Sequence, residues 1–273
     1  HALADRETIS ADDILEGVAG AAEFHSVSAR QSEADAVDDV LSGVSTDLED
    51  GPRKVFAILH AGMDDATPAD LRSDAWIIRQ NALRLLSALR EFLVAFAGPR
   101  AANLARRVEA RVEHGVPRDA VGLTAVDGIG PTRARTLATG GLHSPAAIVE
   151  AGAAELRRAG LSEGVADRIV TNARKFPTID VSWGGFPDEV AAGDSRMCEV
   201  TVRNDGGGAS VGIRVTVNGV EMTATETYLT DSETLPVGVF GADADELEFT
   251  VEVTFPDEPL HPVRATRTVD ISG

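Results

Sequence analysis

The chain has 273 residues, 44 acidic and 25 basic side chains, and a formal net charge of −19 at pH 7. Only Lys54 and Lys175 are lysines, and such acidity with almost no lysine is typical of halophilic proteins, whose acidic surfaces keep them soluble in concentrated salt. The single cysteine, Cys198, excludes an intramolecular disulfide, and the sequence has no signal peptide and no apolar run of about eighteen residues. We therefore expect a cytoplasmic protein that does not enter a membrane.

The charge is distributed unevenly along the chain. Residues 1–71 contain 16 acids and 4 bases, residues 72–176 contain 10 acids and 16 bases, and residues 177–273 contain 18 acids and 5 bases. A basic middle in so acidic a chain indicates a nucleic-acid-binding region, although arginines on solvated helix faces would account for part of it. The first residue is His1 rather than methionine, so we expect the chain to be part of a longer protein.

The first sixty residues are predicted to be helical. Ser10 is a good N-cap in front of an apolar run whose first turn is acidic. A second helix is expected at about residues 31–41. The apolar pattern continues at residues 55–60, after a break at Gly51-Pro52.

A long helix is predicted next. Thr67 as the cap, Pro68 at the first helical position and Asp70 after it indicate where the helix begins, and Gly98-Pro99 ends it. At a rise of 1.5 Å per residue the helix would be about 40 Å long. Its periodicity predicts this buried apolar stripe: Ala75, Ile78, Ala82, Leu85, Leu89, Phe92 and Phe96.

A second face of the same helix combines arginines with a tryptophan. Its members are Arg72, Trp76, Arg79, Leu83 and Arg90. Cations for phosphates and a ring for base stacking are what the binding of a single strand requires, so Arg72, Trp76 and Arg79 are candidate strand-binding residues. The alternative is that Trp76 packs against a neighbouring helix and the arginines lie along its edge. A further arginine-bearing helix is expected at residues 100–113.

Residues 123–137 form the most informative motif of the chain. They show the helix-hairpin-helix pattern, in which two helices flank a tight turn, here Gly128-Ile129-Gly130. The apolar ties between the two helices are Leu123, Val126, Ile129, Ala134 and Leu137. The glycines let backbone N–H groups approach a phosphate at the start of the second helix, where the helix dipole favours an anion, so the turn binds a nucleic-acid backbone without reading bases. The candidate phosphate-binding residues are Gly128, Ile129, Gly130, Thr132, Arg133 and Arg135; a hairpin that only packs is the alternative.

A weaker copy of this hairpin follows at residues 144–175. Two short helices begin at Ser144-Pro145 and at residue 153, and a turn at residues 160–166 precedes a helix that ends near Lys175. This second hairpin is either purely structural or extends a phosphate track. The track would consist of Arg133, Arg135, Arg168, Arg174 and Lys175.

From residue 178 onward the apolar pattern has a period of two, which predicts about seven strands. They are residues 179–183, 198–202, 213–217, 220–228, 234–240, 247–255 and 263–271. Asn218-Gly219 is a strong hairpin turn signal. This indicates an antiparallel β-sandwich of the immunoglobulin or fibronectin type III kind, with Cys198 as a buried, inert thiol. Its acidity should repel nucleic acid and leaves packing or protein contact as its role.

The predicted architecture is therefore a multidomain chain, α then β. Residues 1–117 form a helical bundle with a long central helix, residues 118–176 a tandem helix-hairpin-helix domain, and residues 177–273 the β-sandwich. The sequence has no phosphate-binding loop of the Walker type, no paired metal-ligand motif and no evident catalytic triad. We expect no catalytic residue, no metal and no cofactor in this chain.

The order of these elements resembles the C-terminal region of superfamily-two ATP-dependent helicases, of the archaeal fork-processing DNA helicase type. RNA helicases linked to the exosome, the large spliceosomal helicase and a translocon subunit of the endoplasmic reticulum contain the same three parts. The residues that match are Glu23-Phe24, Arg30, Glu33, Asp74, Ile78, Asn81-Ala82, Arg84-Leu85-Leu86, Ala88-Leu89, Arg106-Arg107 and Glu113-His114-Gly115-Val116.

The resemblance implies a function for the parent protein. Two motor domains upstream of His1 would bind ATP and magnesium and pull a single strand past the long "ratchet" helix, while the hairpin holds the emerging strand. The implied partners are single-stranded or forked DNA, or RNA, together with the motor domains and a protein on the acidic sandwich, in a role in DNA repair. Two other functions stay open: the DNA-binding tail of a repair nuclease or polymerase, and a protein-interaction scaffold that binds no nucleic acid.

Overall fold

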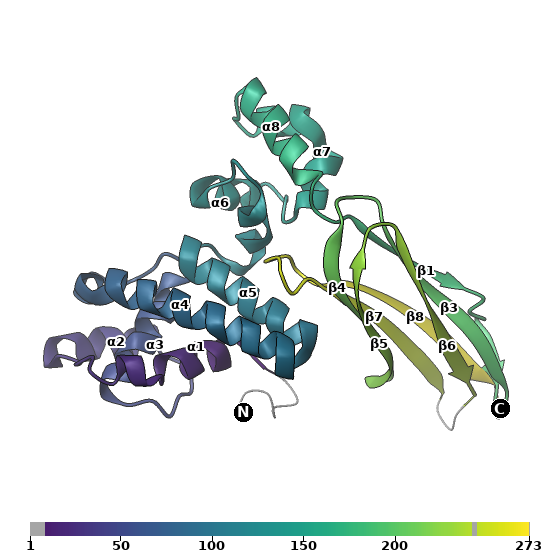
Figure 1. Cartoon of the computed structure of the whole chain (residues 1–273), viewed down its shortest axis with the longest axis horizontal. Helices are drawn as coiled ribbons and strands as arrows, with labels where there is room; N and C mark the ends of the chain where they lie inside the picture. Colours follow the sequence, from purple (N-terminus) through teal and green to yellow (C-terminus); the bar gives the residue numbers. More distant parts are fainter. Residues whose placement is uncertain (1–8, 242–244, 273) are drawn as a thin grey trace. The chain divides into compact units, whose positions relative to one another are not determined.

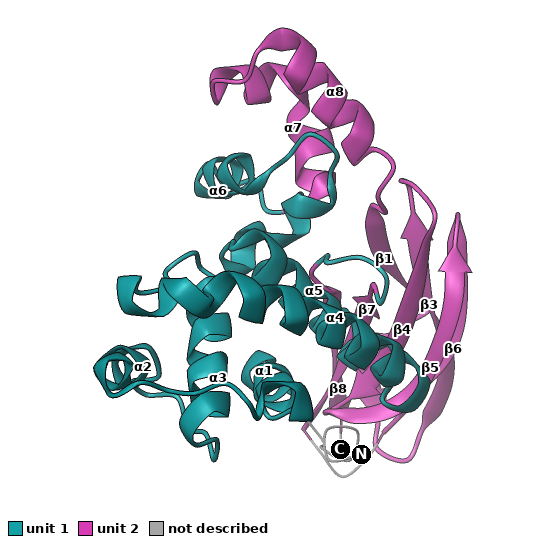
Figure 2. Cartoon of the chain, turned by 60° about the vertical axis from the view of Figure 1, so that its left-hand side comes forward, with its two compact units in different colours: residues 1–143, 256–260 teal, residues 144–255, 261–273 magenta. Residues whose placement is uncertain are grey.

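The computed structural model describes residues 9–241 and 245–272 (Figure 1). The chain divides into two compact units. Unit 1 contains residues 1–143 together with 256–260, and unit 2 contains residues 144–255 and 261–273 (Figure 2). The boundaries that the sequence suggests after residues 117 and 176 stay a prediction.

Unit 1 is helical. Its α-helices are α1 (Ala11–Ala19), α2 (Ala34–Val40), α3 (Asp50–Gly62), α4 (Arg72–Phe96), α5 (Gly98–His114) and α6 (Pro131–Thr139), and its 3₁₀ segments are η1 (Ala22–Phe24), η2 (Gln31–Glu33), η3 (Ala69–Leu71) and η4 (Arg118–Ala125). Ser10 caps α1 as predicted, because its Oγ accepts a hydrogen bond from the backbone N–H of Asp13 at 3.1 Å. The break predicted at Gly51-Pro52 is wrong, since both residues lie in the first turn of α3.

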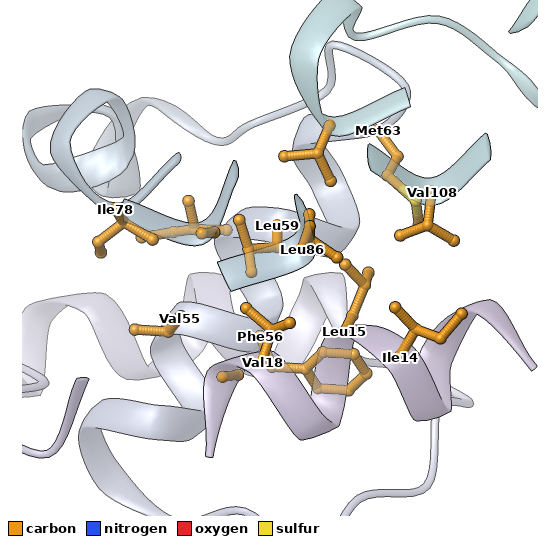
Figure 3. Packing of buried hydrophobic residues seen from close by; sticks show 14 of the residues in the cluster. Ile14, Leu15, Val18, Val55, Phe56, Leu59, Met63, Ile78, Leu86 and Val108 are labelled. Atoms are coloured by element: carbon orange, nitrogen blue, oxygen red, sulfur yellow. The ribbon is translucent and has the colours of Figure 1, made fainter. Parts of the chain in front are cut away.

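The core of unit 1 lies between α1, α3, α4 and α5. Figure 3 shows side chains from all four helices meeting there, among them Leu15, Phe56, Leu86 and Val108. These residues are at most 1% exposed. Burial of large apolar side chains stabilises each by about 1.5–3 kcal/mol relative to exposure, so this shared core holds the long helix in place.

Helix α4 confirms the predicted long helix, with 25 residues and a length of about 38 Å. It begins after the 3₁₀ turn η3, and Thr67 does not cap it. The predicted apolar stripe is only partly right: Ile78 and Ala82 are buried, but Phe96 is 64% exposed. Leu86 and Leu93 take the remaining buried positions, because the face that meets the core is rotated relative to the predicted one.

Unit 2 begins with two helices, α7 (Pro145–Arg158) and α8 (Glu163–Ala173). Ser144 caps α7 by accepting the N–H of Ala147 at 3.1 Å. Gly152, with φ +70°, breaks α7 into two helical segments, as the sequence predicts. The turn between α7 and α8 includes Gly160, whose φ is +95°.

The remainder of unit 2 is a β-sandwich, with eight strands in the part that the structure describes. They are β1 (Ile179–Gly184), β2 (Glu189–Ala191), β3 (Ser195–Asn204), β4 (Ala209–Val217), β5 (Val220–Leu229), β6 (Ser232–Phe240), β7 (Glu246–Thr254) and β8 (Val263–Ser272). One sheet has the order β1-β3-β6 and the other β2-β8-β7-β4-β5. The fold class is thus confirmed: helices first, then a sandwich.

Three details of the sandwich bear on the sequence predictions. Asn218 and Gly219 both have positive φ, +47° and +81°, as the predicted hairpin turn requires. The short strand β2 was not predicted; it pairs with β8 in parallel, so the sandwich is not purely antiparallel. Cys198 is buried as predicted, and burial raises the pKa of its thiol.

The connection between β7 and β8 contains a segment that belongs to unit 1. Residues 256–260 pack with α5 there, where the buried Asn103 donates its side-chain Nδ2 to the carbonyls of Glu258 at 3.1 Å and Leu260 at 3.0 Å. Arg106 Nε adds a hydrogen bond to the carbonyl of Asp257 at 3.3 Å. The helical unit is therefore assembled from two stretches of chain that are far apart in sequence.

Candidate nucleic-acid interface

The glycine turn between η4 and α6 has the geometry that the motif predicts. Val126 and Ile129 are buried, and the N–H of Ile129 donates to the carbonyl of Val126 at 3.0 Å, which closes the turn. Gly128 has φ +96°, a conformation that L-residues with a side chain rarely adopt. The helix predicted before the turn is a 3₁₀ segment rather than an α-helix. All five predicted apolar ties are nevertheless buried.

The start of α6 is open to a ligand. Gly130 is the N-cap, no side chain caps the helix, and Pro131 occupies the first turn. A methyl group built on Gly130 would meet no atom within 4 Å. The N–H groups of the first helical turn have no intrahelical acceptor, so those of Thr132 and Arg133 lie at an exposed, electropositive helix end.

The two arginines of α6 differ in what they contact. Arg133 is exposed, and its Nη1 donates to the carbonyl of Gly128 at 2.7 Å, so its charge lies beside the turn. Arg135 points back into unit 1: its Nη2 donates to the carbonyl of Gly115 at 2.5 Å and lies 3.0 Å from Asp65 Oδ2. Arg133 is therefore placed to meet a phosphate, whereas Arg135 joins α6 to the end of α5.

Trp76 lies on the exposed side of α4. It is 71% exposed, and its neighbour Ile77 is 50% exposed, so Trp76 does not pack against a neighbouring helix. Arg72 is also exposed, with its Nε donating to the carbonyl of Thr67 at 3.2 Å. A large exposed ring beside a cation is the arrangement that base stacking needs.

The other arginines predicted beside Trp76 turn toward α5. Arg79 Nη2 donates to the carbonyl of Glu113 at 2.6 Å, and Arg90 lies 3.6 Å from Glu109. The arginine pattern of the sequence does not indicate the residues that share the exposed side of Trp76. They include Ser73, Ile77, Gln80, Arg84, Ala88 and Glu91, all of them exposed, and at 100° per residue they fall within a 120° arc that begins at Trp76. The arginines of the predicted face lie on the other side of Trp76 along the helix surface, so only the position of Trp76 itself indicates these residues.

A buried ion cluster fixes the first turn of α4. Lys54 is fully buried on α3, and its Nζ lies 2.8 Å from Glu33 Oε2 and 2.5 Å from Asp74 Oδ2. Burial alone would lower the pKa of Lys54, but the hydrogen bonds to Asp74 and Glu33 outweigh it and raise the pKa. The hydrogen bond from Lys54 lowers the pKa of Asp74. Since Asp74 is two residues before Trp76, the cluster anchors the helix turn that presents the tryptophan.

The family model of the Sec63 Brl domain matches residues 3–272. The chain belongs to the Sec63 Brl family. This domain is a C-terminal part of superfamily-two helicases. The matching helicase residues named from the sequence have structural partners here: Glu33 and Asp74 hold Lys54, and Glu23 Oε1 accepts a hydrogen bond from Arg84 at 2.5 Å.

Other comparisons are sparser. No curated protein matches the chain. Among solved structures, the CARDB domain of a Pyrococcus furiosus protein in complex with di-metal ions is similar over 36% of this chain and 90% of that chain, with 22% identity and a TM-score of 0.30. A β-glucosidase from Listeria innocua is similar over 36% of this chain and 16% of its own, with 13% identity and a TM-score of 0.28.

Two further observations on this Sec63 Brl chain concern metal ions and membranes. Among the described residues, no group of three or more histidine, cysteine, aspartate or glutamate side chains is arranged to hold a metal ion. None of the helices in the described part of the chain combines the length and the apolar character needed to cross a membrane.

Proposed function

We propose that this chain is the accessory part of an ATP-dependent DNA helicase and holds single-stranded nucleic acid through two contacts. The first is the turn of residues 128–133, which binds phosphate through backbone N–H groups and Arg133. The second is the exposed side of α4, where Trp76 stacks on a base and Arg72 meets a phosphate. ATP and magnesium would be bound by motor domains of the parent protein, and forked DNA in repair would be the substrate.

The exposure of Trp76 is the observation on which this proposal depends. Trp76 is 71% exposed, and its neighbour Ile77 is 50% exposed, so the ring offers an open face on which a base can stack. Membership in a helicase-associated family supports a nucleic-acid base as the stacking partner. Contacts by stacking and by short N–H bonds also suit a halophilic protein, because the Debye length in molar salt is only about 3 Å.

The test is a fluorescence-anisotropy titration of labelled single-stranded DNA with the whole chain in concentrated KCl, with duplex DNA and RNA as competitors. The variant Trp76→Ala should weaken binding about tenfold or more, since stacking of one base contributes about 1–3 kcal/mol. Phe96→Ala is the matched control, because Phe96 lies on the same helix and is 64% exposed. Equal binding by both variants would exclude Trp76 as a contact.

The turn is tested by Gly130→Glu. Gly130 has φ −85° and open space around it, so glutamate fits without strain and places a negative charge where the phosphate would lie. Thr139→Glu adds the same charge at the opposite end of α6, where Thr139 is exposed, and serves as the control. If the turn binds phosphate, Gly130→Glu should abolish the preference for a single strand, and Thr139→Glu should leave it unchanged.

The remaining functions that the sequence left open give different results in the same experiment. A scaffold would bind none of the three nucleic acids even at moderate salt. The tail of a repair nuclease or polymerase would bind equally well through the turn but would not lose affinity in Trp76→Ala. The proposed function therefore requires that Trp76→Ala and Gly130→Glu both weaken the binding of single-stranded DNA.

A further inference from the structure

Most cationic side chains of unit 2 are neutralised by acids. Ion pairs join Arg157 to Glu163, Arg158 to Glu155, Arg203 to Asp205, Arg214 to Glu221, Arg264 to Glu252 and Arg267 to Asp188. An acidic chain in salt has many carboxylates available, so a cation of unit 2 without such a partner needs an explanation.

Four cations of unit 2 have no such partner among the described residues: Arg196 on β3, and three that lie together at α8 and the turn after it. The side chains of Arg168, Arg174 and Lys175 are exposed and make no ion pair or hydrogen bond within the described residues. Of the two acids in α8, Glu163 is taken by Arg157, which leaves Asp167. This group, the α8 cations, includes one of the two lysines of the chain.

Helix geometry places Arg168 on the side of α8 away from the core, and Arg174 and Lys175 follow directly after the last helical residue, Ala173. Ala166, Ile169, Val170 and Ala173 are the buried residues of α8, and α8 lies beside α7 in both views (Figures 1 and 2). At 100° per residue Arg168 lies opposite that buried side, and the exposed Thr171 follows one turn later on the same side. The backbone continues as a turn beyond α8, where the N–H of Lys175 donates to the carbonyl of Asn172 at 3.1 Å. Arg168 is thus held by a packed helix, and Arg174 and Lys175 lie in the hydrogen-bonded turn that ends it.

The spacing and the chemistry of these cations fit a polyanion. Arg168 lies about 7–8 Å along the helix axis before Ala173, the end of α8, and Arg174 and Lys175 follow there. One strand of B-DNA carries a charge per about 3.4 Å, so the three cations together span two or more phosphates. Among the described residues of α8 there is no aromatic side chain for stacking. Contacts of this type bind the backbone and do not distinguish bases.

We propose that the α8 cations form a second binding site for the phosphate backbone of a single strand, separate from the turn of residues 128–133 and from Trp76. This site lies in unit 2, whereas the two contacts of the proposed function lie in unit 1. Its contribution is electrostatic, so it is strongest at low salt, whereas stacking by Trp76 persists in concentrated salt.

The test is the salt dependence of single-strand binding by the whole chain carrying Arg168→Gln, Arg174→Gln and Lys175→Gln together. Neutralising three phosphate contacts should reduce the slope of log K against log [KCl] by about 2, because each contact contributes about 0.7 for a single strand. Affinity in 0.2 M KCl should fall about tenfold or more, with little change in concentrated KCl.

A matched control removes the same charge from the same unit. Arg158→Gln, Arg203→Gln and Arg214→Gln neutralise three arginines that acids already hold, and this variant should keep the wild-type slope. Equal slopes for both triple variants would overturn the proposal, and so would absence of wild-type binding at 0.2 M KCl. Loss of binding in Trp76→Ala with no effect of the α8 variant would refute the α8 site alone and leave the proposed function standing; the opposite pair of results would refute the Trp76 contact alone.

Discussion

The two lysines of the chain occupy opposite environments, one in each unit. Lys54 in unit 1 is fully buried between Glu33 and Asp74. Lys175 in unit 2 is exposed, and its side chain has no partner among the described residues. The same positive charge therefore stabilises a helix bundle in one unit and is available to a ligand in the other.

Because of this difference, the net charge of a segment is a poor measure of the charge that a nucleic acid can reach. Residues 72–176 have a net charge of +6, but many of their arginines are bound to groups of unit 1. Arg79 and Arg135 donate to carbonyls at the end of α5, and Arg111 lies 2.8 Å from Asp64. The charge available to a nucleic acid is consequently smaller than the net charge of the segment, and it belongs to the cations that make no ion pair among the described residues.

The largest effect is expected from replacing the buried lysine. Lys54→Met should lower the free energy of unfolding by about 3–5 kcal/mol, because it leaves Glu33 buried without its cation. Lys175→Met, the matched control, should change it by less than about 0.5 kcal/mol. Urea unfolding followed by circular dichroism in fixed KCl measures both. Equal stability of the two variants would mean that the buried cluster does not hold unit 1 together.

The pH dependence of stability is a second test of the buried cluster around Lys54. Burial opposes the shift, but the hydrogen bonds from Lys54 and from the N–H of Arg30 lower the pKa of Glu33 below its ordinary value of 4.5. The hydrogen bond from Lys54 lowers the pKa of Asp74 below 3.8. A carboxyl with a lowered pKa stabilises the fold above its ordinary pKa, and this stabilisation disappears as the pH falls through the lowered value.

The unfolding free energy of the wild type should therefore fall steeply below about pH 4. Lys54→Met should lose less on acidification, since its two carboxylates no longer gain from a cation. Burial raises the pKa of Glu258, which gives that carboxyl the opposite sign; the series is therefore repeated in Glu258→Gln. Parallel pH curves for wild type and Lys54→Met would contradict the prediction.

The sequence predicts correctly the features that depend on residues close together along the chain, and it fails for features that depend on distant residues. The cap at Ser10, the turn at residues 128–130 and the Asn218-Gly219 hairpin depend on neighbours within a few residues, and all three are as predicted. The parallel pairing of β2 with β8 joins residues about eighty positions apart, and no period within a three-residue strand reveals it. The rotation of α4 that exposes Phe96 likewise depends on the helices packed around it.

The candidate site shows the same limit at the level of side chains. The sequence identifies Trp76 and the glycine turn, because residue type and spacing determine them. It does not reveal that Arg135 is held by Gly115 and Asp65, whereas Arg168 is unpaired among the described residues. Those partners come from other elements of the fold, so only the three-dimensional arrangement separates structural arginines from available ones.

A smaller effect is expected from the two buried asparagines, one in each unit. Asn103 donates to the carbonyls of Glu258 and Leu260, and Asn204 donates to those of Gly207 and Leu229 while its Oδ1 accepts from two backbone N–H groups. Each alanine variant should lose about 1–3 kcal/mol, because buried partners are left unsatisfied. Limited proteolysis separates them: Asn103→Ala should expose residues 256–260 to cleavage, and Asn204→Ala should not.

The smallest effect comes from the glycine turns of the two units. Gly128 and Gly160 have almost the same positive φ, +96° and +95°, so alanine at either position should cost about 1–2 kcal/mol of stability. Only Gly128 borders the proposed phosphate-binding turn, and its carbonyl accepts the hydrogen bond from Arg133. Gly128→Ala should therefore weaken single-strand binding several-fold while Gly160→Ala, equally destabilised, binds as the wild type does. Anisotropy titrations at equal folded fraction make the distinction, because equal affinities would show that the turn of residues 128–133 has no more part in binding than its counterpart in unit 2.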